Sequence, residues 1–108
     1  MLVLGLLAGL SDRYIIQSNR ESGHGRYDIM LIPRTPQDPG VIIEFKKAKD
    51  SDNKILTASA QGALKQIRNK SYITQIKGSG YQGSIFCYGI AVYKKHVVVA
   101  IETINKIN

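Results

Sequence analysis

The stretch from residue 27 to residue 46, YDIMLIPRTPQDPGVIIEFK, contains two short apolar runs joined by a proline-rich loop. Runs of this length, rich in aliphatic residues and bounded by turn residues, predict two β-strands. Each strand carries an acid where its neighbours are apolar, Asp28 in the first and Glu44 in the second. Because strand side chains alternate between faces, Glu44 shares a face with Lys46. If the strands are neighbours in a meander, both acids and Lys46 meet at one place.

The rest of the chain supplies elements on both sides of this stretch. Spacing of apolar residues and turn signals predicts further helices and strands. Helices are expected at 1–10 and 53–76, the second either continuous or with a bend. Strands are expected at 14–20, 27–32, 41–47, 84–93 and 96–101. The order α-βββ-α-ββ predicts one α/β domain over residues 1–108, with a mixed central sheet flanked by helices.

Composition narrows the class of protein. The chain has 108 residues and 44% hydrophobic residues, so it is long enough for one globular domain. One cysteine and two histidines exclude an internal disulfide and a Cys/His zinc cluster. Of the net charge of +7, residues 44–77 hold +5, from eight basic and three acidic residues. A basic cluster of this kind attracts polyanions, although a solvated helix face accounts for it equally well.

The apolar segment 1–10 is too short to span a bilayer, which needs about 20 apolar residues. It also lacks the basic start and cleavage site of a signal peptide. We therefore expect a cytoplasmic protein with no membrane partner. A helix this apolar at the start of the chain has two explanations: the chain is a piece of a longer protein, or the helix is buried in a homodimer.

Carboxylates within apolar strands are costly to bury unless a cation or hydrogen bonds compensate. Two carboxylates with a backbone carbonyl and waters form an oxygen-ligand site for Mg²⁺ or Mn²⁺. An ammonium beside them, that of Lys46, can polarise a water and stabilise charge on a phosphoryl group. The alternatives are a solvent-facing position for each acid, or an ion pair between Glu44 and a lysine.

Asp28, followed after fifteen residues by Glu44-Phe45-Lys46, resembles the signature of the PD-(D/E)XK nuclease superfamily. Residues 18–31, SNRESGHGRYDIML, are similar to the nuclease-like domain found C-terminal to an ATPase-like domain in many bacterial proteins. The resemblance covers most of residues 2–101. It implies a restriction-endonuclease-like core, with the preceding domain and part of the first helix missing before Met1.

The resemblance implies that Asp28 and Glu44 hold Mg²⁺ or Mn²⁺ together with the Phe45 carbonyl, and that Lys46 is the catalytic lysine. Position 27 is tyrosine where the signature has a proline, a common departure in the superfamily. The first helix lacks the additional acid that many members carry there. Glu21 is the candidate replacement, with pairing to a neighbouring arginine as its alternative role.

Gln66, Lys70 and Tyr72 resemble the glutamine–tyrosine motif that RecB-like nucleases place beside the metal, although the spacing here is longer. This resemblance implies that Gln66 is catalytic and that Lys70 and Tyr72 contact nucleic acid; a polar helix face is the alternative. Other candidates for phosphate contacts are Lys47, Lys49, Lys65 and Arg68.

Three functions are therefore open. The leading hypothesis is a metal-dependent nuclease that hydrolyses phosphodiester bonds, with DNA as the expected substrate. The second is a catalytically silent nucleic-acid-binding or regulatory module of an ATPase-linked system. The third is an interaction domain that dimerises through residues 1–10. A binding module needs none of the three charged groups Asp28, Glu44 and Lys46, so their joint presence favours the enzyme.

Overall fold

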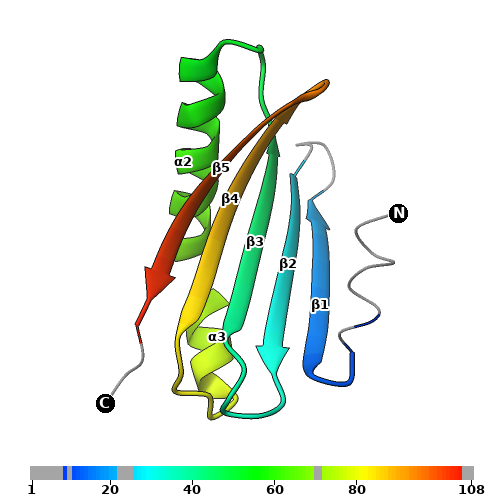
Figure 1. The fold of residues 1–108 in the computed structure, drawn as a ribbon, viewed down its shortest axis with the longest axis vertical. Helices are drawn as coiled ribbons and strands as arrows, with labels where there is room; N and C mark the ends of the chain where they lie inside the picture. The colour runs from blue at the N-terminus through cyan, green and yellow to red at the C-terminus, as the bar shows by residue number, and fades with distance from the viewer. Residues whose placement is uncertain (1–8, 10, 22–25, 70–71, 106–108) are drawn as a thin grey trace.

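A computed structural model describes residues 9, 11–21, 26–69 and 72–105, and shows one mixed sheet with helices on one face (Figure 1). Its elements, in chain order, are β1 (Tyr14–Glu21), β2 (Arg26–Pro33), β3 (Gly40–Lys47), α2 (Asn53–Asn69), α3 (Tyr72–Gly78), β4 (Ile85–Tyr93) and β5 (His96–Ile104). The α/β class and the strand order predicted from the sequence are confirmed.

The five strands lie in the sheet in their chain order, β1-β2-β3-β4-β5. Each neighbouring pair is antiparallel except β3 and β4, which run parallel because α2 and α3 cross over between them. The first three strands form the expected meander. The last two form a hairpin, whose two-residue turn, Lys94-Lys95, follows from the pairing of Tyr93 with His96.

Both helices cover the same face of the sheet, here called the helix face (Figure 1). The main core forms there, where Ile42 of β3 and Ile85 of β4 pack against Leu64 of α2 and Ile76 of α3. A smaller cluster around Ile29 forms on the opposite face. In β3 the alternate residues from Gly40 to Glu44 are buried on the helix face, so the period of two seen in the sequence holds.

The helical segment expected over 53–76, as one helix or as a helix with a bend, is present as two helices, α2 and α3. Asp52 caps α2: its carboxylate accepts a hydrogen bond from the Lys54 amide at 2.7 Å. Gly80, with φ of +96°, follows the end of α3. No helix in the described ranges is long and apolar enough to cross a membrane.

The helix expected over 1–10, of which only residue 9 is described, falls outside the described residues, as does the homodimer that it was expected to form. Four of the observed strands extend beyond the predicted limits by one to three residues at an end, and β2 includes Pro33. The exception is β4, which begins one residue later than predicted.

An ion pair ties the start of β1 to the loop between β2 and β3. The Arg13 guanidinium donates to both carboxylate oxygens of Asp38, and Thr35 donates a further hydrogen bond to that carboxylate. The hydrogen bond from Arg13 is the main reason that the pKa of Asp38 lies below its ordinary value of 3.8. Ionised Asp38 therefore favours the folded state.

This ion pair predicts a specific dependence of stability on pH. The contribution of Asp38 is complete above the pKa it has in the unfolded chain, and is lost as the pH falls through its lower folded value. Asp38→Asn should lower the free energy of unfolding at pH 7 and flatten its decline between about pH 5 and pH 2. Urea unfolding at each pH measures this. Arg13→Gln should give the same profile, and a decline in Asp38→Asn as steep as in the wild type would contradict the assignment.

Candidate active site

Asp28 and Glu44 lie directly opposite each other on adjacent strands. The antiparallel register of β2 and β3 pairs their Cα atoms, so the Cβ atoms of such a pair are about 5 Å apart on the same face. Both residues lie on the helix face, with exposed fractions of 3% and 0%. The convergence expected from the two apolar runs is therefore present, and it places two carboxylates in the buried interior.

Glu44 is enclosed on its other side by α2. Its partner on β4 is Gly89, and a Cβ atom on that glycine would lie 2.3 Å from the Ala60 carbonyl oxygen and 2.9 Å from the Leu64 nitrogen. The backbone of α2 therefore rests on the bare backbone of β4, next to Glu44. This close approach covers the β4 side of Glu44.

Lys46 points from the helix face toward α2. It lies two residues beyond Glu44 on β3, about 7 Å along the strand. A Cβ atom on Gly62 of α2 would lie 3.1 Å from the Lys46 Nζ atom. The missing side chain of Gly62 thus leaves the space that the ammonium group uses, on the same face as the two carboxylates.

Tyr72, the first residue of α3, reaches the site from the opposite side. It is buried, and its hydroxyl donates a hydrogen bond of 2.5 Å to the Oδ2 atom of Asp28. A short hydrogen bond of this kind is typical of a hydroxyl donating to a carboxylate. Tyr72 was expected to contact nucleic acid; this contact instead suits a residue that orients Asp28.

A cavity of about 510 Å³ opens beside Asp28. It lies between β1, β2 and α3, over the part of the helix face next to β1. The residues that line it are Ile16, Gln17, Ser18, Asp28, Met30, Tyr72 and Gln75. Asp28 is therefore the member of the carboxylate pair that faces an open space.

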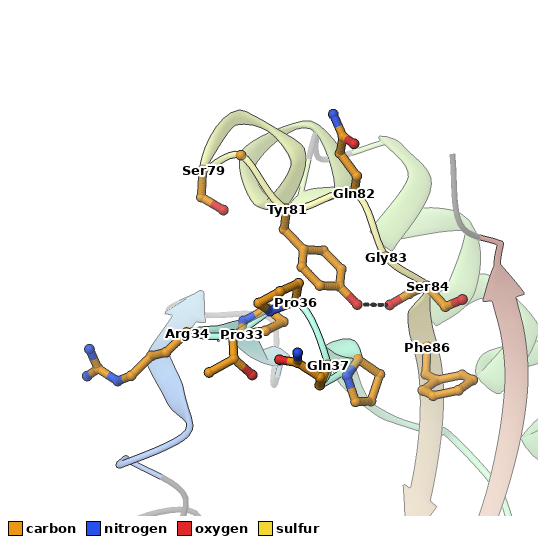
Figure 2. Close-up of a pocket in the computed structure, with 13 residues that line it drawn as sticks. Pro33, Arg34, Pro36, Gln37, Ser79, Tyr81, Gln82, Gly83, Ser84 and Phe86 are labelled. Atoms are coloured by element: carbon orange, nitrogen blue, oxygen red, sulfur yellow. Dashed lines mark hydrogen bonds between the residues drawn. The ribbon is translucent and has the colours of Figure 1, made fainter. Parts of the chain in front are cut away.

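A larger cavity, of about 800 Å³, lies at the other end of the sheet between the β2–β3 loop and the α3–β4 loop. Figure 2 shows Tyr81 directed across it toward the loop that carries Pro36, with its hydroxyl bonded to the Ser84 carbonyl oxygen at 2.9 Å. The described residues of its lining include none of the predicted catalytic residues. Size alone therefore does not identify the site, and the chemistry points to the smaller cavity.

The donor groups fit a small divalent cation. Within the described ranges, no three His, Cys, Asp or Glu side chains gather closely enough to form an all-protein metal cage. Mg²⁺ does not need one, since it is usually held by one or two carboxylates and keeps several waters. The Asp28–Glu44 pair supplies those two carboxylates, and the adjoining cavity has room for the waters.

The other residues predicted for the catalytic site, besides the Asp28–Glu44 pair and Lys46, lie on β1, β3 and α2 or outside the described residues. Glu21 ends β1, paired with Arg26, and Lys70 lies outside the described residues. Phe45 lies in a central strand, between Tyr27 and Ile90. Gln66 is partly exposed on α2 and does not line the cavity at Asp28.

The predicted phosphate contacts are surface residues. Lys47, Lys49 and Lys65 are exposed. Arg68 forms an ion pair with Glu102 of β5, the strand at the far edge of the sheet from β1. That pairing gives Arg68 a structural partner, which weakens its candidacy for phosphate contact.

Sequence reasoning missed four residues that shape the site: Gly62, Gly89, Gln17 and Gln75. The glycines matter because they lack a side chain, and only the packing of α2 shows which atoms come close. Gln75 had a signal in the sequence, since it follows Tyr72 by three residues and so lies on the same side of a helix. Gln17 could have been found from the alternation of side chains in β1, which places it on the helix face beside its partner Met30.

Comparison with known proteins gives one family. The family model described as the PD-(D/E)XK nuclease superfamily matches residues 1–102. Among curated proteins, none matches the chain. The match includes both strands of the carboxylate pair, the strand that carries Lys46 and the helix that carries Gly62.

Proposed function

Since the chain belongs to the PD-(D/E)XK nuclease superfamily, we propose that it is a Mg²⁺- or Mn²⁺-dependent nuclease that hydrolyses phosphodiester bonds in DNA. One observation carries the proposal: Asp28 and Glu44 form a buried cross-strand pair on the face that also carries Lys46. Two carboxylates on one face supply the oxygen donors that a small divalent cation prefers. An ammonium group on the same face can stabilise charge on a phosphoryl group.

Each side chain has a role in the proposed hydrolysis. Asp28 and Glu44 would hold the cation, with the Phe45 carbonyl as a third oxygen donor; when bound, it would lower the pKa of a water and polarise the phosphoryl oxygens. Tyr72 holds Asp28 in one orientation through its hydrogen bond. Lys46 stabilises the negative charge that develops on the phosphoryl group as water attacks phosphorus and the bond to the leaving sugar oxygen breaks.

Substitution of Lys46 tests the proposal. Lys46→Ala should lower the rate of plasmid cleavage in Mg²⁺ or Mn²⁺ at least about 100-fold, because a positioned cation is removed from the reacting phosphate. Affinity for DNA, measured by gel shift without metal, should change less than about threefold, since one ammonium is a small part of a surface of charge +7. Lys77→Ala, which removes an exposed lysine of α3, is the matched control.

Two outcomes would count against an enzyme. Cleavage by Lys46→Ala at the wild-type rate would point to a contaminating nuclease. Binding to DNA that weakens with salt, without cleavage in either metal by the wild type, would favour the catalytically silent binding module.

Gly62 provides a second, finer test of the role of Lys46. A Cβ atom at this position comes within 3.1 Å of the lysine Nζ atom, so Gly62→Ala should displace the ammonium by a few tenths of an ångström. Alanine inside a helix is more favourable than glycine by up to about 1 kcal/mol, so Tm should stay equal or rise. Cleavage should nevertheless slow by about three- to tenfold, because catalysis is sensitive to small displacements.

Thermal melting and cleavage rates, measured on the same preparations, separate these two effects. A variant that is both less stable and less active would mean that alanine disturbs the packing of α2 itself. A variant as active as the wild type would show that the ammonium does not need this space.

A further inference from the structure

The cavity beside Asp28 is larger than a hydrated cation needs, and its walls are mostly residues that the proposed hydrolysis does not use. Two of these residues, Gln17 of β1 and Gln75 of α3, are exposed amides. Met30 is a buried apolar residue of the same lining. The cavity thus combines neutral hydrogen-bonding groups with an apolar surface, next to one carboxylate.

The fold brings the two glutamines to this cavity from different directions. Gln17 pairs with Met30 in the register of β1 and β2, so it lies on the helix face, one step along that face from Asp28. Gln75 lies one turn after Tyr72, whose hydroxyl binds Asp28. Helix α2 packs chiefly on β3, β4 and β5. Among the described elements, the cavity beside Asp28 therefore lies over β1 and β2, away from the strands that α2 covers.

The chemistry of the lining favours a base over a phosphate. Among the residues that the structure describes in this lining, the hydrogen-bonding groups beside Asp28 and Tyr72 are neutral, two glutamine amides and a serine hydroxyl. Glutamine amides both donate and accept hydrogen bonds, as the edges of nucleobases do. A volume of about 510 Å³ is that of a small-molecule pocket, which suits one nucleotide rather than a duplex.

We infer that this cavity receives one unstacked nucleotide adjacent to the bond that is cut, and that the preferred substrate is single-stranded DNA. The inference rests on the proposed function, and it names the substrate of the same site. A base in a duplex must leave its stack and its partner before it can enter such a cavity, at a cost of a few kcal/mol. A single strand presents its bases without most of that cost.

The experiment compares Gln17→Ala, Gln75→Ala and the double variant with the wild type. Gln61→Ala, which truncates an exposed glutamine of α2 outside the cavity lining, is the matched control. Affinity for a fluorescent single-stranded oligonucleotide and for its duplex is measured in EDTA, where no cleavage occurs. Cleavage of both is then measured in Mg²⁺ and Mn²⁺.

The wild type should bind and cleave the single strand at least about tenfold better than the duplex. Each glutamine substitution should weaken binding of the single strand about fivefold, the effect of one lost hydrogen bond, and Gln61→Ala should not. Tm should change little in any variant, since all three side chains are exposed.

The outcomes separate this inference from the proposed function. Equal cleavage of single strand and duplex, or glutamine variants that behave like Gln61→Ala, would overturn the inference and leave the nuclease in place. Absence of cleavage, with single-strand binding that still depends on Gln17 and Gln75, would support the inference and overturn the catalytic proposal.

Discussion

Glu44→Gln is expected to reduce the rate of DNA cleavage on the order of 1,000-fold or more, because it removes one of the two charges that would hold the cation. Glutamine has nearly the same shape as glutamate, so the packing of α2 over this position can be kept. Glu44 is fully buried, and any loss of function therefore comes from the carboxylate itself rather than from a surface contact with DNA.

Metal binding can be measured without cleavage. At a free Mn²⁺ concentration of 100 times the Kd, binding stabilises the folded state by about 2.7 kcal/mol. For a domain near this size, that raises Tm by roughly 10 to 20 °C. The wild type should show this rise, and Glu44→Gln should lose most of it.

Glu102→Gln is the matched control, since it neutralises a partly exposed glutamate on β5 that pairs with Arg68. It should keep both the cleavage rate and the effect of Mn²⁺ on Tm. If Glu44→Gln cleaved DNA at the wild-type rate, or kept the full rise in Tm, the Asp28–Glu44 pair would not be the metal site.

The position of this pair could be predicted because it depends on local rules only. Strand alternation puts an acid on one face of each strand, and a meander with a short loop makes the two strands neighbours. Together these rules predict that Asp28 and Glu44 come together at one place, and the register puts them directly opposite each other. The cation itself stays a prediction, since donor groups alone do not establish it.

The sequence left open whether the segment 53–76 is one helix or has a bend, because apolar residues keep a helical spacing throughout. Ile67 and Ile76 are both buried, and periodicity does not show where α2 ends and α3 begins. The start of α3 matters for the site: Tyr72 begins this helix and binds Asp28. A residue expected to contact nucleic acid thereby becomes a buried neighbour of the carboxylate.

Contacts between residues far apart in the chain could not be predicted from the sequence either. Arg68 shares a helix with Lys65 and looks like a phosphate contact in the sequence, yet it pairs with Glu102, 34 residues away. Nothing in the spacing of either residue indicates this partner. The distance between α2 and the sheet could not be predicted either. It depends on Gly89, and a pattern of apolar residues does not show where a glycine allows a close approach.

Gly89→Ala is expected to destabilise the protein by about 3 kcal/mol, the upper end of the usual cost of overpacking. The added Cβ atom would lie 2.3 Å from a backbone oxygen and 2.9 Å from a backbone nitrogen of α2. Backbone atoms in a helix cannot rotate away as the end of a side chain can, so the whole helix must move. Tm should fall by roughly 12 to 24 °C.

Gly78→Ala is the matched control, because a Cβ atom at this helical position meets nothing within 4 Å. It should leave Tm unchanged or raise it slightly. Unchanged stability in Gly89→Ala would mean that α2 does not rest on β4 at this distance. Since Gly89 pairs with Glu44, a displaced helix would also expose that carboxylate to water, so the alanine variant should bind Mn²⁺ more weakly even at temperatures where it remains folded.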